Sequence, residues 1–290
     1  MTNKINRKEF IKYLSISSGA LFSGYKLFSN DDAQNFMKLG LVTYQWGKDW
    51  DIPTLIKNCT NAGIFGVELR VEHAHGVDIK ITSAERIQVK KKFSESKVQI
   101  LGMGTNQQFD FPDQSELRKS IETAKEFIKL SYDIGGTGVK VKPNGFHKEI
   151  PHEKTIEQIG NSLKEIGKYA VDFNQQIRLE VHGNETQELP NIKAMMDIAD
   201  HPNVKVCWNS NPEDLNGQGL EYNFNLVKNR LGDTVHVREL NIGDYPYQKL
   251  LNMLKKENYN GWILLECRTE PIDKVQALIE QRIIWEKMIA

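Results

Sequence analysis

The chain has 290 residues, with 38 acidic and 38 basic side chains and a formal net charge of zero. This balance argues against a nucleic-acid partner, because binding to a phosphate backbone relies on an excess of positive charge. Cys59, Cys207 and Cys267 lack the short spacing of metal or disulfide motifs, and we interpret them as buried apolar residues. The length suits one large α/β domain or two domains of ordinary size.

Residues 1–30 differ in composition from the rest of the chain. The stretch "NRKEFIKYLSISSGALF" joins a basic segment to an apolar one and is similar to a twin-arginine export signal, with Lys8 in place of the second arginine. The alternative is an amphipathic N-terminal helix packed on the domain. The apolar run is too short for a bilayer and includes Lys26, so we expect no stable membrane span. An export signal would predict a periplasmic or exported protein. An N-terminal helix packed on the domain would instead predict a cytoplasmic protein.

From residue 38 onward, short β-like runs alternate with segments whose apolar residues recur at helical spacing. Ile121, Ala124 and Ile128 show that spacing. Gly63 and Gly135 lie where glycines commonly end helices. The expected strands are residues 38–45, 66–70, 98–105, 138–143, 177–183, 204–209, 234–240 and 262–268.

Eight strands that each precede a helix predict a (β/α)8 barrel, also called a TIM barrel. The 253 residues from 38 to 290 have the usual length for this fold, at about 250 residues. No linker rich in proline or glycine divides them. The sequence therefore predicts a single barrel domain over residues 38–290.

Polar residues recur at positions i and i+2 near the ends of the expected strands, whereas the alternating positions are mostly apolar. Side chains two apart share one face of a strand, so the polar face should point into the barrel mouth, where the chemistry of such barrels occurs. We therefore predict a polar pocket there. The pairs are Glu68/Arg70, Lys140/Lys142, Glu180/His182, Asn209/Asn211, His236/Arg238 and Glu266/Arg268.

Four of these residues lie on the last four expected strands and are candidate metal ligands: Glu180, Asn209, His236 and Glu266. Carboxylate, amide and imidazole groups suit a divalent cation such as Mn²⁺, Mg²⁺, Co²⁺ or Zn²⁺. The alternative is an internal ion-pair network with Arg238 and Arg268, because such networks also gather charged residues. We expect Lys142 to lie nearer the mouth than Lys140, and Trp46 could line the pocket by stacking on an apolar ring face or belong to the core.

The sequence resembles the xylose isomerase-like barrels, the sugar phosphate isomerase/epimerase group. The resemblance implies a metal held by Glu180, Asn209, His236 and Glu266. Asn209 departs from the pattern because many members have aspartate there, and "HVREL" departs from the common "HvkD". The motifs that carry the resemblance are "GVELR", "EHAHGVD", "GVKVKPNGF", "LEVHG", "DIADHPNVKVCWNSNPED", "VHVREL" and "LLECR".

The resemblance also implies an activity: proton transfer next to a carbonyl through an enediolate, as in sugar isomerases and epimerases. Glu180 and Glu266 would be the catalytic pair, on opposite sides of the substrate carbon. The "EHAHGVD" loop would lie at the barrel mouth. A small carbohydrate would then contact residues from several strand ends and loops, namely Trp46, His73, His75, Lys142, His182, Arg238 and Arg268.

Three other functions are compared with this one: two stay open, and the third is disfavoured. A lyase or hydratase acting on keto-sugars could use the same base beside an activated carbonyl. A non-catalytic sugar-binding barrel is the alternative that Asn209 favours. An endonuclease of the same fold would need three zinc ions and a basic face, which the neutral charge does not favour. A homo-oligomer is compatible with the sequence.

Overall fold

A computed structural model describes residues 37–290. The expected export signal at residues 1–30 lies outside the described residues. Within them, no helix combines the length and apolar character that a membrane crossing needs.

All eight strands in the described part of the chain are parallel and pair in the order β6-β5-β4-β3-β2-β1-β8-β7. The two remaining edges, β6 and β7, approach each other through backbone bonds, including one of 2.7 Å from the His236 amide to the Trp208 carbonyl. The sheet is thus a nearly closed barrel. The strands are β1 (Lys38–Val42), β2 (Gly66–Arg70), β3 (Gln99–Gln108), β4 (Gly138–Lys142), β5 (Gln176–Glu180), β6 (Val204–Cys207), β7 (Thr234–Val237) and β8 (Trp262–Leu265).

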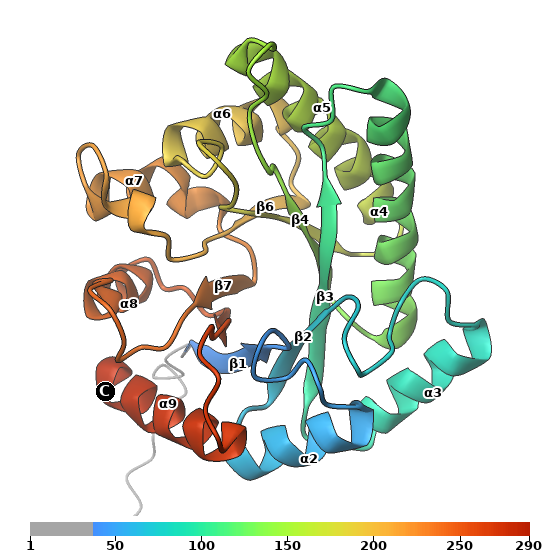
Figure 1. Cartoon of the computed structure of the whole chain (residues 1–290), viewed down its shortest axis with the longest axis vertical. Coiled ribbons are helices and arrows are strands. Elements are labelled where there is room, and N and C mark those ends of the chain that lie inside the picture. Colours follow the sequence, from blue (N-terminus) through green and yellow to red (C-terminus); the bar gives the residue numbers. More distant parts are fainter. Residues whose placement is uncertain (1–36) are drawn as a thin grey trace, which may run out of the picture. The chain divides into compact units, whose positions relative to one another are not determined.

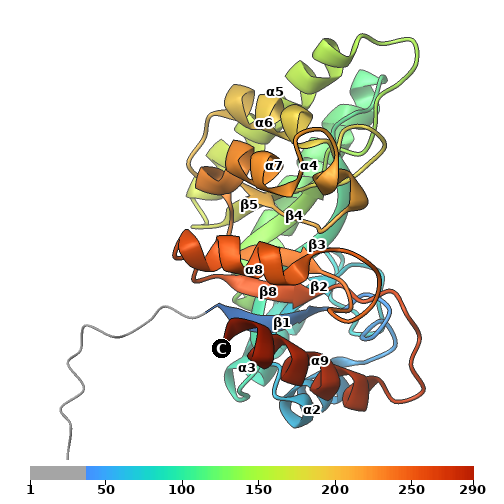
Figure 2. The same cartoon turned by 90° about the vertical axis from the view of Figure 1, so that its left-hand side faces the viewer.

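Helices lie outside the strands, as Figures 1 and 2 show from two directions. This arrangement confirms the predicted (β/α)8 barrel. Two short 3₁₀ turns, η2 (Pro212–Leu215) and η3 (Lys228–Arg230), flank one of the helices. The helices are α2 (Ile52–Ala62), α3 (Ser83–Ser94), α4 (Gln114–Ile134), α5 (His152–Val171), α6 (Leu189–Ala199), α7 (Leu220–Val227), α8 (Tyr247–Lys256) and α9 (Lys274–Ile289).

Local sequence signals explain where several of these helices begin and end. The side chain of Asp51 accepts a hydrogen bond from the Thr54 amide at the start of α2, and Asp113 caps α4 in the same way. Gly63 and Gly135 end these two helices with φ angles of 73° and 90°. A side chain is disfavoured in this left-handed conformation, so the predicted roles of both glycines are confirmed.

The strands divide apolar from polar side chains in the way that their alternation predicts. Val139, Val141 and Leu179 are fully buried in the core between the strands and the helices. The alternating residues Lys140 and Glu180 are buried as well, yet they carry charge. Because a buried charge needs a partner, the polar side chains of the barrel interior must satisfy one another or a bound ligand.

Candidate active site

The candidate ligands lie at the carboxyl ends of the last four strands. Glu180 is the last residue of β5, and His236 lies within β7. Asn209 and Glu266 follow β6 and β8 by two residues and one residue, so these strands end earlier than the sequence suggested. A hydrogen bond of 2.7 Å from the Glu266 amide to the Val237 carbonyl continues the strand pairing and fixes the position of Glu266.

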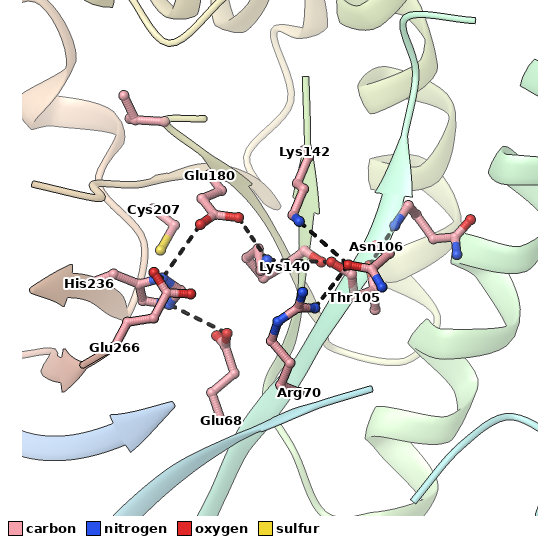
Figure 3. A network of polar contacts seen from close by, with 12 residues as sticks. Glu68, Arg70, Thr105, Asn106, Lys140, Lys142, Glu180, Cys207, His236 and Glu266 are labelled. Carbon is pink, nitrogen blue, oxygen red and sulfur yellow. Dashed lines mark hydrogen bonds and ion pairs between the residues drawn. The ribbon is translucent and has the colours of Figure 1, made fainter. Parts of the chain in front are cut away.

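Three of the four candidate ligands converge inside the barrel. Glu180, His236 and Glu266 each offer one ligand atom, and these atoms lie within 4.8 Å of one another. The Nδ1 atom of His236 is 3.9 Å from Oε1 of Glu180 and 3.9 Å from Oε2 of Glu266. Figure 3 shows the two carboxylates beside the imidazole.

Asn209 supplies the test of whether this cluster fits a metal ion. Its Oδ1 atom is buried and has no hydrogen-bond partner among residues 37–290, and neither has Nδ1 of His236. Buried polar atoms are nearly always satisfied, so these unpaired atoms beside two carboxylates are available to a ligand. The donor set of Glu180, Asn209, His236 and Glu266 therefore fits a divalent ion.

The other ring nitrogen of His236 faces Glu68 from strand β2. Its Nε2 atom lies 3.4 Å from Oε1 of Glu68, and both side chains are fully buried. A Cβ atom at Gly104 would lie 2.8 Å from that same carboxylate oxygen, so the absence of a side chain there leaves room for Glu68. Such a carboxylate orients a metal-ligating histidine and sets its tautomer.

The environment of His236 favours positive charge. Burial alone would lower its pKa, but Cys207, Glu68 and Glu180 outweigh burial and raise the pKa of His236 well above its ordinary value. A proton on the imidazole is thus stabilised by these neighbours, of which Glu180 is also a candidate cation ligand.

Glu180 forms a buried ion pair with Lys140. The Lys140 Nζ atom is 2.7 Å from Oε2 of Glu180, and the side chains are 1% and 2% exposed. Burial would raise the pKa of Glu180, but the charges of Lys140 and His236 hold it well below its usual range. Burial likewise opposes the charged form of Lys140, yet Glu180 and Glu68 raise its pKa. Both groups are therefore charged.

A small cavity of about 70 Å³ opens beside this cluster. Cationic side chains and the two catalytic candidates share its wall. Among the residues predicted to bind substrate, Lys142, His182 and Arg268 line it. Arg70 lines it as well, as a member of one of the predicted polar pairs, whereas Tyr44 was not predicted to do so. The full lining is Tyr44, Arg70, Lys140, Lys142, Glu180, His182, Asn209, Glu266 and Arg268.

Two further predicted substrate residues do not line the cavity. Arg238 donates to Oδ1 of Asn211 at 3.2 Å and lies 3.9 Å from Glu266. Trp46 is buried, and its Nε1 donates to the backbone carbonyl of Thr269 at 2.9 Å. Trp46 thus holds the segment after β8 in this structure rather than presenting a face to the cavity.

The two histidines of "EHAHGVD" have different surroundings. His75 is buried: Nδ1 accepts from the Val77 amide at 3.0 Å, and Nε2 bonds the Arg70 carbonyl at 2.8 Å. Burial lowers the pKa of His75 to about 4. Both ring nitrogens are occupied in this structure, and the substrate contact of His75 stays a prediction. His73 lines a neighbouring groove of about 310 Å³ instead of the cavity.

The segment after β8 is fixed by Glu239, which together with Arg238 departs from the common "HvkD" motif. Its Oε1 atom accepts hydrogen bonds from the Arg268 amide at 3.0 Å and the Thr269 amide at 2.7 Å. Burial opposes ionisation, but a hydrogen bond from the Thr269 hydroxyl, together with those from the backbone amides, holds the pKa of Glu239 below its usual range. Glu239 therefore positions Arg268 at the cavity mouth.

The fold and this cluster define a TIM-barrel protein with a candidate divalent-metal centre at the carboxyl ends of its strands. The chain belongs to the xylose isomerase-like TIM barrel family, whose family model matches residues 56–285. No curated protein matches the sequence.

Solved structures with the same fold include enzymes of more than one kind. The apo form of 3-keto-D-glucoside 4-epimerase, YcjR, from E. coli is 15% identical, with a TM-score of 0.74 over 87% of this chain and 100% of that one. The IOLI protein with a bound zinc atom is 14% identical, with a TM-score of 0.73 over 87% and 98%. The probable 3-DHS dehydratase AsbF from Bacillus anthracis is 14% identical, with a TM-score of 0.67 over 86% and 99%.

Proposed function

We propose that the protein is a metal-dependent isomerase or epimerase of a small carbohydrate. The observation that carries this proposal is the buried Nδ1 atom of His236, placed 3.9 Å from carboxylate oxygens of both Glu180 and Glu266. The unpaired Oδ1 atom of Asn209 adds a fourth donor. A structural ion-pair network would leave fewer acceptors unsatisfied.

Glu180, Asn209, His236 and Glu266 would hold Mn²⁺, Mg²⁺, Co²⁺ or Zn²⁺. A bound cation would polarise the substrate carbonyl and stabilise the negative charge that develops on its oxygen. Glu180 or Glu266 would then remove the proton from the adjacent carbon, and the substrate would pass through an enediolate.

Glu180 and Glu266 come from different strands and can act from two sides of the same carbon. Lys140 keeps Glu180 ionised and fixed through their bond of 2.7 Å. Glu266 is less constrained, because its nearest basic groups, on His236 and Arg238, are both 3.9 Å away. We assign proton removal and return to this pair: one carboxylate, in its ionised form, takes the proton, and the other, which starts in its protonated form, returns its own proton to the opposite face of the carbon. This describes an epimerisation, whereas an isomerisation needs the proton to be returned to the neighbouring carbon.

A lyase or hydratase acting on keto-sugars is the second candidate, because the same first step can be followed by loss of a β-leaving group. The similarity to a probable dehydratase supports keeping it. The two reactions share Glu180 and Glu266 and differ in their products. An epimerase returns a proton to the carbon, whereas a lyase releases water or an aglycone.

The test combines metal content with deuterium exchange. The wild type, Glu266→Gln and Glu280→Gln are loaded with each of the four cations and incubated with keto- and aldo-sugars in D₂O. Glu280 is exposed on α9 and provides a matched control. We expect deuterium next to the carbonyl with the wild type and the control, and a loss of at least 100-fold in rate with Glu266→Gln.

Three results would lead to different conclusions. Exchange that requires Glu266 supports proton-transfer catalysis. Release of water or an aglycone, with the same requirement, assigns the lyase. No bound metal and no exchange with any sugar would contradict both proposals and favour a non-catalytic sugar-binding barrel.

A further inference from the structure

The cavity beside Glu180 and Glu266 has more positive charge on its wall than its carboxylates compensate. Four cationic residues line it, and two carboxylates face them. Lys140 is paired with Glu180 at 2.7 Å, and Glu266 already has Arg238 at 3.9 Å. The remaining cations on the wall are Arg70, Lys142 and Arg268.

None of these three has a carboxylate within 4.0 Å among residues 37–290. Arg70 instead donates to Oδ1 of Asn106 at 2.9 Å, and the Lys142 ammonium donates to the same oxygen at 3.4 Å. Figure 3 shows both cations directed at this single neutral acceptor. The Asn106 amide can accept hydrogen bonds but cannot neutralise charge.

Two cations held against one amide oxygen repel each other, and burial adds to the cost. The pKa of Lys142 reflects this cost, because burial and the charges of Lys140 and Arg70 lower it to about 8. A fold that only needed rigidity would gain from a carboxylate or a neutral residue here. Positive groups converging on a cavity are instead the arrangement that binds an oxyanion.

The geometry assigns an oxyanion subsite to Arg70, Lys142 and Arg268, and we propose that the substrate is an acidic sugar whose carboxylate or phosphoryl group binds there. The proposal rests on the proposed function for the site but adds the charge of the substrate. Asn106 is a positioning residue, because it holds Arg70 and Lys142 together. Arg268 reaches the same mouth from the segment that Glu239 fixes.

The position of the subsite relative to the carboxylates supports this assignment. Lys142 lies two residues after Lys140 on β4, so both side chains share the inner face of the strand. Lys140 bonds Glu180 deep in the barrel, while Lys142 is half-buried nearer the mouth. An acidic group held by Lys142 would leave the rest of a small sugar over Glu180 and Glu266.

The test compares three probes that share one scaffold: D-glucose, D-glucuronate and D-glucose 6-phosphate. Dissociation constants are measured by calorimetry for the wild type, Arg70→Gln, Lys142→Gln and Lys148→Gln. Lys148 is exposed in the segment after β4 and is the matched control. We expect one acid to bind at least tenfold tighter than D-glucose, and each of the two site variants to remove at least tenfold of that affinity. D-Glucose should change less than twofold.

Inorganic phosphate provides a probe that does not depend on the sugar. It should raise the melting temperature above that in sodium chloride of equal ionic strength, and Arg70→Gln and Lys142→Gln should remove the difference. The absence of any acid preference together with the absence of phosphate stabilisation would overturn the proposal. An equal loss in Lys148→Gln would overturn it as well, by showing a general charge effect.

Deuterium exchange on the same proteins separates this proposal from the proposed function. Exchange on neutral sugars without any preference for acids would contradict the oxyanion subsite and still support the isomerase. Acid binding that depends on Arg70 and Lys142, without exchange on any probe, would support the subsite and count against the isomerase.

Discussion

His236 and Glu68 face each other across the barrel interior, with Nε2 of the imidazole 3.4 Å from Oε1 of the carboxylate. The two residues are 168 positions apart in the sequence and come from β2 and β7. The opposite nitrogen of His236 points at Glu180 and Glu266. In the proposed metal-bound state, Glu68 would keep the single remaining proton on Nε2 and leave Nδ1 free to bind the cation.

Replacing Glu68 with glutamine is expected to weaken binding of a divalent metal by about 10- to 100-fold, because the imidazole loses the carboxylate that orients it. Competition with a chelator measures the dissociation constant directly. Gly104→Ala gives an independent test, since its Cβ would lie 2.8 Å from Oε1 of Glu68 and displace a side chain whose charge is unchanged. Unaltered affinity in both folded variants would refute this role.

Lys140→Met is expected to lower the free energy of unfolding by about 3 to 5 kcal/mol, because it leaves Glu180 as an unpaired buried charge. Urea denaturation measures the loss. The double variant Lys140→Met with Glu180→Gln should recover part of it, since no buried charge is then left without its partner. A loss in the double variant equal to the sum of the two single losses would show that the pair is not coupled.

The same pair predicts the sign of a pH effect. Lys140 holds the pKa of Glu180 below its unfolded value, which is about 4.3 for a glutamate. The pair therefore stabilises the fold fully above that pH, and its contribution is lost as the pH falls further. The difference in stability between the wild type and Lys140→Met should shrink in acid. A difference that stays constant down to the lowest pH at which the fold survives would contradict this.

Much of the barrel could be predicted from sequence because each strand is short and its alternation is local. Val139 and Val141, with Lys140 between them, already show which face is apolar. The strand ends were less accurate: β5 was expected to continue to residue 183 and ends at Glu180. A strand ends where pairing with its neighbours stops, and the residues of the strand alone do not determine that position.

The contacts of the site were harder to predict than its members. The spacing of Glu68 and Arg70 placed them on one face, but no local pattern indicates that Glu68 meets His236 or that Arg70 shares Asn106 with a lysine. The spacing of His73 and His75 likewise gave no reason to expect different surroundings for the two histidines. The structure separates them, because two backbone groups bind the ring of His75.

The pKa of Lys142 predicts how binding of an acidic sugar depends on pH. Its value of about 8 means that the ammonium is charged below pH 8 and loses its charge above it. The dissociation constant of D-glucuronate should therefore rise between pH 7 and pH 9.5, while the probe itself stays ionised, because carboxylates titrate near pH 4. D-Glucose should show no such rise, and Lys142→Arg should remove it for the acid. A flat profile in the wild type would exclude Lys142 from the subsite.

Asn209→Asp is expected to tighten metal binding by at least tenfold, because a carboxylate replaces the neutral amide whose Oδ1 is buried and unpaired within residues 37–290.

The same change places a third carboxylate beside Glu180 and Glu266. Like charges in a buried site repel, so the chelator-treated variant should melt at a lower temperature than the chelator-treated wild type. Added metal should then raise its melting temperature by more than it raises that of the wild type. Melting curves with and without a chelator test both signs together. If the variant gained no metal affinity and lost no stability, the Asn209 side chain would not face the cation, and the donor set would reduce to Glu180, His236 and Glu266.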